Sequence, residues 1–169
     1  MQTLITTSEL KKYTPTNYGL DPQVINGIIE TAEICYIKPC LGTDFYDELI
    51  LQVNTNTLTP DNLILMDNYL SFVLAWFVLS DGVTYMDTRI DNKGLNHNID
   101  PATAQTASAG KTEEIKRDAK FKAEKWRKEM IDFLNTNIAL YPLFRSSTEC
   151  CCNDNANCGF SFPTYFKKR

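Results

Sequence analysis

The sequence predicts a mainly α-helical protein: a small helical bundle of about four helices, with a long protruding loop or hairpin between the last two main helices and an extended C-terminal arm. Apolar residues recur at helical spacing in four segments, and proline-containing helix starts precede two of them. A long stretch before the last segment has no such period. At 169 residues, the chain can bury one core without metal or disulfide staples.

The first predicted helix runs from about Asp21 to Lys38. Asp21 is a suitable N-cap, and Pro22 suits the first helical position. We expect Pro39 and Gly42 to end this helix. Its apolar residues at helical spacing are Ile25, Ile28, Ile29, Ala32, Tyr36 and Ile37.

A short second helix is expected to follow, with Thr43 as its cap. Its apolar side is formed by Phe45, Tyr46, Leu49, Ile50 and Val53. Three carboxylates, those of Asp44, Asp47 and Glu48, stand near its start, where negative charge offsets the helix dipole. We therefore interpret them as helix-stabilising residues.

The third predicted helix is the most apolar and should form the centre of the bundle. Thr59, Pro60 and Asp61 repeat the cap-then-proline signal at its start. Its main stripe is Leu63, Met66, Leu70, Val73 and Phe77, and Ile64, Leu74, Trp76, Val78 and Leu79 occupy its other sides. We expect protein all round this helix. The longest apolar run, residues 69–79, is shorter than the roughly 20 residues of a membrane span, which predicts no membrane contact.

The segment from about Thr88 to Gly110 is the predicted loop or hairpin. It contains few large apolar residues and has a turn-forming centre at Asn92, Lys93 and Gly94. Loops of about twenty residues are uncommon inside a domain and are usually functional or disordered. We therefore interpret the segment as a protruding arm.

The last long helix is predicted to begin at Thr112 and to end at Pro142. Its buried stripe is Ile115, Ala119, Ala123, Trp126, Met130, Phe133, Leu134, Ile138 and Tyr141. Between Lys111 and Lys128 there are eight Lys or Arg and four Asp or Glu residues. Mixed charges at helical spacing usually form a solvated face, and contact with DNA phosphates is the alternative.

Two regions follow from this pattern: a helical domain over residues 1–144, with its loop at 88–110, and a tail over residues 145–169. The tail has no period that would bury it in the domain. Its aromatic residues, Phe160, Phe162, Tyr165 and Phe166, predict a segment that orders on a partner.

No catalytic, cofactor-binding or metal-binding residues are assigned. Gly110, Lys111 and Thr112 resemble the end of a phosphate-binding loop, but position 105 is Gln where that motif needs Gly. His97 is the chain's one histidine and lies in the predicted loop, which disfavours a nucleophile–histidine pair. A small nucleotide-binding protein that uses Lys111 and Thr112 remains an alternative.

The six cysteines allow a second alternative, a thiol- or zinc-binding module in the tail. Cys150, Cys151, Cys152 and Cys158 could supply four thiolates, although three consecutive cysteines rarely face one tetrahedral ion. Cys35 and Cys40 are expected to fill the core or an interface. The N-terminal sequence has no secretory signal, so we expect a cytosolic protein with free thiols.

Three segments of the sequence resemble the head–tail connector, or head-completion, proteins of tailed phages, closest to those of the crAss-like phages of gut Bacteroidetes. The segments are LITTSELKKYTP, IIETAEICYIKPCLGTDFYDEL and TRIDNKGL. The resemblance covers residues 1–141 and does not extend to the cysteine-rich tail. It implies a helical bundle with a long loop between its last two main helices.

The resemblance also implies a structural, non-enzymatic role in the virion neck, in a protein made in the host bacterial cytoplasm. Such subunits form a ring, typically of twelve copies, that binds the portal protein and neighbouring neck or tail proteins. The loop residues Arg89, Ile90, Asn92, Lys93, Gly94 and Leu95 would then reach a neighbouring subunit or the channel. Lys93 would make non-specific contact with passing DNA, and the aromatic tail would dock on the portal or the next ring.

Overall fold

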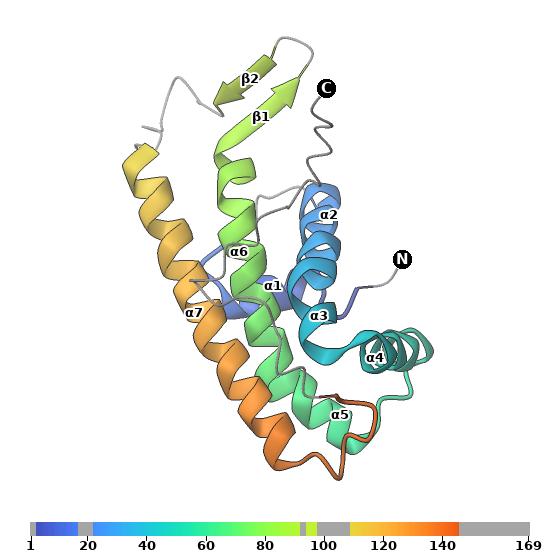
Figure 1. Cartoon of the computed structure of the whole chain (residues 1–169). Coiled ribbons are helices and arrows are strands. Elements are labelled where there is room, and N and C mark those ends of the chain that lie inside the picture. Colours follow the sequence, from blue (N-terminus) through green and yellow to red (C-terminus); the bar gives the residue numbers. More distant parts are fainter. Residues whose placement is uncertain (1–2, 17–21, 92–93, 98–108, 146–169) are drawn as a thin grey trace, which may run out of the picture.

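The computed structural model describes residues 3–16, 22–91, 94–97 and 109–145, and most of them are helical (Figure 1). The helical elements are α1 (Thr7–Tyr13), α2 (Pro22–Ala32), η1 (Glu33–Ile37), α3 (Lys38–Leu41), α4 (Thr43–Thr55), α5 (Pro60–Leu65), η2 (Met66–Leu70), α6 (Ser71–Asp87) and α7 (Ala109–Thr136). Strands β1 (Thr88–Asp91) and β2 (Gly94–His97) lie between α6 and α7. The predicted mainly helical bundle is confirmed.

Helix α1 begins at a capping box that the sequence analysis did not identify. The Thr6 side chain accepts a hydrogen bond from the Glu9 N–H, and the Glu9 carboxylate accepts one from the Thr6 N–H. Leu10 on this helix is fully buried, and α1 packs against α6 and α2. The N-terminal segment is therefore part of the bundle.

The first long helix was predicted to end at about Lys38, before Pro39. Instead, it continues through α2, η1 and α3 to Leu41, directly before Gly42. In η1 the turn widens to a π-helix, and the Lys38 N–H donates to the carbonyl of Glu33, five residues earlier. Proline usually breaks a helix because it lacks an N–H and its ring meets the carbonyl four residues earlier. Here Pro39 falls at the start of α3, directly after the widened turn, where the helical register has already shifted.

The chain turns sharply at Gly42, which ends α3 and also caps α4. Its backbone has φ 84° and ψ 153°, a conformation almost restricted to glycine. Thr43, predicted to be the cap of the second helix, is instead its first residue. Gly42 therefore sets the direction in which α4 leaves the end of α3.

The third helical rod, formed by α5, η2 and α6, is the centre of the bundle, as predicted. Thr59 caps it by accepting a hydrogen bond from the Asn62 N–H. Helices α1, α2 and α7 pack against α6 (Figure 1). Most of the predicted stripe is buried, but Leu63 and Ile64, near the start of the rod, are 48% and 47% exposed, contrary to the prediction of protein all round.

This rod has the length and composition of a membrane span over Pro60–Val83. However, 61% of the apolar window in that segment is buried within the bundle. The core helix of a globular bundle meets the same criteria, because it is also surrounded by apolar groups. The packing of α6 accounts for this composition.

Aromatic pairs join the central rod to its neighbours. Tyr69 stacks on Phe133 at 4.5 Å between ring centroids, and Phe72 stacks on Trp126 at 4.8 Å. A third stacked pair, Tyr36 with Phe77 at 4.1 Å, joins η1 to α6. Such pairs add about 0.5–1.5 kcal/mol each beyond the area that they bury.

Helix α7 begins at Ala109, before the predicted Thr112, and ends at Thr136, well before Pro142. Its buried stripe agrees with the prediction except near the two ends, where Ile115 and Ile138 are exposed. Past Thr136 the chain forms tight turns that bring the Tyr141 hydroxyl to the carbonyl of Asp61, at 2.8 Å. These turns close one end of the bundle against α5.

Two glycines give a matched test of the junction at Gly42. A methyl group on Gly42 or on Gly27 would meet no atom within 4 Å, and only Gly42 of the two has a positive φ. Gly42→Ala should therefore destabilise the protein by about 1–3 kcal/mol through backbone strain alone. Gly27→Ala, within α2, should stabilise it by about 0.5–1 kcal/mol. Urea unfolding of both variants measures this, and equal effects of one sign would contradict the assigned geometry.

Candidate functional site

The predicted loop is a β-hairpin at one end of the bundle (Figure 1). Strands β1 and β2 pair antiparallel, with Arg89 opposite Asn96 and Ile90 opposite Leu95. Figure 1 shows the hairpin extending past the end of α6, from which β1 continues. Gly94 begins β2, whereas Asn92 and Lys93 lie outside the described residues. The backbone of β1 and β2 thus forms a hairpin that protrudes from the bundle, as the sequence predicted.

The tail residues predicted to dock on a partner, Phe160, Phe162, Tyr165 and Phe166, lie outside the described residues. The same holds for Cys150, Cys151, Cys152 and Cys158, so the thiol or zinc alternative stays a prediction. Within the described part of the chain, no group of three or more His, Cys, Asp and Glu side chains could hold a metal ion.

The two described cysteines have different surroundings. Cys40 is buried, as expected of a core residue, and its Sγ lies 3.8 Å from the Arg127 Nη1 on α7. Cys35 is exposed on η1. Neither of these two cysteines forms a disulfide bond.

The other chemical motifs are dispersed. Gly110, Lys111 and Thr112 form part of the first turns of α7, and the residues that would complete a phosphate loop lie outside the described ranges. His97 ends β2, where its backbone pairs with Thr88. The structure thus brings no second catalytic group of the predicted kinds to either position among the residues it describes.

The outer side of α7 is rich in charged side chains, with eight Lys or Arg and four Asp or Glu residues over positions 111–128. Three of its cations are paired within the helix: Lys116 with Glu113 at 3.8 Å, Lys122 with Asp118 at 2.7 Å, and Arg127 with Glu124 at 2.5 Å. Arg117, Lys120, Lys125 and Lys128 are exposed and form no ion pair with any described residue. These four charges are available to an external partner.

Two shallow hollows lie beside Arg117 on this side of α7. The larger, of about 450 Å³, is lined by Gly110, Glu113, Glu114, Lys116, Arg117 and Lys120. The smaller, of about 360 Å³, also includes Phe121, whose side chain is 70% exposed. Among the large apolar side chains of the described residues, that of Phe121 is the most exposed.

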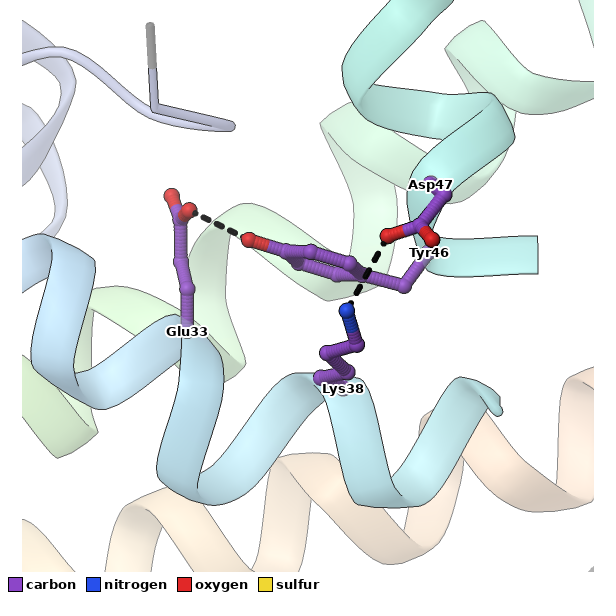
Figure 2. Close-up of polar contacts among 4 residues, drawn as sticks. All are labelled: Glu33, Lys38, Tyr46 and Asp47. Atoms are coloured by element: carbon purple, nitrogen blue, oxygen red, sulfur yellow. Dashed lines mark hydrogen bonds and ion pairs between the residues drawn. The ribbon is translucent and has the colours of Figure 1, made fainter. Parts of the chain in front are cut away.

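A buried carboxylate, that of Glu33, lies on the opposite side of the central rod from α7. Glu33 is 2% exposed and is the first residue of η1. Its Oε1 accepts a hydrogen bond from the Leu4 N–H at 2.6 Å, and its Oε2 accepts one from the Tyr46 hydroxyl at 3.1 Å. Figure 2 shows the tyrosine ring reaching from α4 to this carboxylate. One side chain thus joins the N-terminal segment, η1 and α4.

Burial raises the pKa of Glu33 to about 7, although the hydrogen bonds from Leu4 and Tyr46 act in the opposite direction. Burial also raises the pKa of Tyr46, and the negative charge of Glu33 adds to this effect. The tyrosine therefore remains a hydrogen-bond donor, while the glutamate changes charge near neutral pH.

The Tyr46 ring is also covered by a surface ion pair. The Lys38 Nζ lies 3.1 Å from the Asp47 Oδ1 and 5.1 Å from the centroid of the Tyr46 ring (Figure 2). Both partners are partly exposed, so the pair contributes at most about 1 kcal/mol. Its main effect is to hold the edge of α4 next to α3.

The sequence analysis did not identify Glu33, although a signal was present. Ile29 and Ile37 stand one helical turn before and after it, and both are buried. A glutamate between two such positions must be buried with partners or interrupt the apolar face. The arrangement indicates a structural connection, because the Glu33 carboxylate accepts hydrogen bonds from both the N-terminal segment and α4.

A comparison with family models matches residues 37–154 of the chain to DUF6712, a family of unknown function. The chain belongs to this family. The matched region starts at the end of η1, includes the hairpin and α7, and continues past the predicted boundary at Phe144. No curated protein and no solved structure matches the chain significantly. Family membership therefore assigns no activity, and the function must be inferred from the residues.

The raised pKa of Glu33 predicts a specific pH dependence of stability. The carboxyl takes up a proton on folding between about pH 4.5 and pH 7, so its favourable contribution is complete below pH 4.5 and is lost as the pH rises through 7. Glu33→Gln should remove about 2–3 kcal/mol of the difference in unfolding free energy between pH 4.5 and pH 8.

Urea unfolding at a series of pH values tests this. Asp67→Asn, which removes an exposed carboxylate, serves as the control and should leave the pH profile close to that of the unmodified protein. Parallel profiles for the unmodified protein and Glu33→Gln would show that Glu33 does not titrate in this range.

Proposed function

We propose that this protein is a structural virion component of a tailed phage, a head–tail connector subunit that assembles with copies of itself into a neck ring. The ring binds the portal protein, neighbouring neck or tail proteins, or both. It extends the DNA channel and gives the tail a docking surface. No covalent chemistry is involved.

The observation that carries this proposal is the β1–β2 hairpin. It includes the TRIDNKGL segment on which the resemblance to connector proteins partly rests, and it extends from the bundle between its two last main helices. A paired two-stranded ribbon is marginally stable in isolation, so a protruding one gains stability from contact with another surface. The hairpin is suited to reach a neighbouring subunit or the channel.

The physical basis of the ring is repeated contact between two different surfaces of the same subunit. Each copy adds one such heterologous interface. The ring closes when the rotation that relates neighbouring copies is a whole-number fraction of a full turn. Twelve copies is the number that the connector resemblance implies. Lys93, which stands between β1 and β2 in the sequence, would contact DNA phosphates without sequence preference if it faces the channel.

Mixing the purified protein with portal particles of the same virus tests the proposal, with negative-stain electron microscopy as the measurement. We expect an added ring at one end of the portal. The absence of any binding to portal or neck particles would contradict the connector role.

The hairpin's part in assembly can be tested by replacing residues 89–96 with a short Gly-Ser linker. We expect the variant to keep its helical circular dichroism spectrum, because the hairpin extends past the end of α6, away from the packed helices (Figure 1). It should give incomplete rings or none on the portal. Complete rings from this variant would assign assembly to other surfaces. Replacing the linker by the original segment provides the control.

A further inference from the structure

Charge is segregated along this chain. Residues 13–88 contain ten Asp or Glu residues and one cation, Lys38, whereas residues 111–128 contain eight Lys or Arg and four Asp or Glu. The fold keeps the two groups apart: α7 lies along one side of the molecule and α4 on the other, with α6 between them (Figure 1). The subunit therefore carries acidic residues without cations on α4 and a surplus of cations over residues 111–128 of α7.

The basic side has an apolar centre. Arg117, Phe121, Lys125 and Lys128 are exposed and lie 4, 8 and 11 residues apart, which places them along one side of the helix. We call these four residues the α7 face. Its three cations have no ion-pair partner among the described residues, and Phe121 is 70% exposed.

The acidic side has a corresponding composition. Asp44, Asp47 and Leu51, spaced by three and four residues, lie along the exposed side of α4. We call these three residues the α4 face. Leu51 is 56% exposed, and Asp47 is held in place by its ion pair with Lys38. Each face thus combines one exposed apolar side chain with charged groups that are mainly of one sign, although the exposed carboxylates of Glu114 and Asp118 lie beside the cations of the α7 face.

We infer that the α7 face of one copy docks on the α4 face of the next copy. Phe121 and Leu51 would form the apolar centre of this contact, with Arg117, Lys125 and Lys128 opposite Asp44 and Asp47. An apolar centre with a charged rim is the usual anatomy of a protein–protein interface. The inference rests on the proposed ring function and names the surfaces that build the ring.

A second copy fits the α7 face better than DNA does. Glu114, Asp118 and Glu124 are interspersed among the eight cations of residues 111–128, and three of those eight are already paired within the helix. A DNA duplex would place these carboxylates against a continuous row of phosphates, whereas the α4 face brings only the two carboxylates of Asp44 and Asp47. The exposed phenylalanine also has no partner on the duplex backbone, whereas Leu51 offers it an apolar one.

Exchanging the charges of the two faces tests the inference. Variant A carries Arg117→Glu and Lys128→Glu, and variant B carries Asp44→Lys and Asp47→Lys. Each variant alone would bring like charges together, so both should associate more weakly than the unmodified protein. Mixed together, A and B present opposite charges at both contacts and should form alternating assemblies.

Binding of fluorescently labelled A to B, followed by sedimentation velocity at low salt, measures the effect. We expect A with B to associate at least about 10-fold more tightly than A with A or B with B, and the gain to shrink at about 1 M salt. Circular dichroism establishes that both variants are folded. Lys11→Glu with Lys12→Glu, on α1, changes the net charge as variant A does and should not pair with B.

An uncharged variant tests the apolar centre separately. Phe121→Ala should weaken self-association of the unmodified protein and of the A–B mixture without changing its dependence on salt. Unchanged association would remove Phe121 from the interface.

The outcomes separate this inference from the connector role. If A and B do not pair at concentrations up to about 1 mM, the interface is wrong, even where electron microscopy shows rings on the portal. If variant A instead loses binding to duplex DNA and B does not restore pairing, the α7 face is a DNA surface. If A and B pair but no ring forms on portal particles, the interface holds and the connector role fails.

Discussion

The fold depends on covering the central rod of α5, η2 and α6 with protein. A helix that is apolar on every side cannot remain in water, and this rod has no polar face between Leu70 and Val78 other than Ser71, which is itself buried. Helices α1, α2 and α7 provide the cover, and stacked aromatic pairs hold α7 and η1 to the rod. The surfaces available to partners are therefore the sides of the helices that do not cover the central rod.

Helix positions and most buried residues could be predicted from the sequence because periodic apolar residues report burial directly. The start at Pro60 and the stripe through Ala119, Ala123 and Met130 are examples. The errors have physical causes. Leu63 and Ile138 continue the apolar period but are exposed near the ends of their rods. Pro142 did not end α7, because the helix had already given way to turns that carry Tyr141 to Asp61.

The candidate site was less predictable than the fold. The turn at Asn92, Lys93 and Gly94 indicated the hairpin because turn residues have local backbone requirements. The buried Glu33 was not found because its partners, Leu4 and Tyr46, are distant in sequence and come together only in the tertiary structure. The π-helical turn at η1, after which the helix continues through Pro39, was also not predicted from the sequence. The positions of the α4 face and the α7 face relative to each other could not be predicted from the sequence, because they depend on how both helices are arranged around α6.

The position of Glu33 has a consequence for the order of synthesis. Leu4 and Ile5 are almost fully buried, yet they are made well before η1 and α4, which supply the carboxylate and the hydroxyl at this junction. During translation, Leu4 and Ile5 therefore cannot be buried at this junction until some forty further residues have been made. This number is the sequence separation of Leu4 and Tyr46. The N-terminal segment can thus complete this junction only after α4 has been made, although it is the first part of this sequence to be translated.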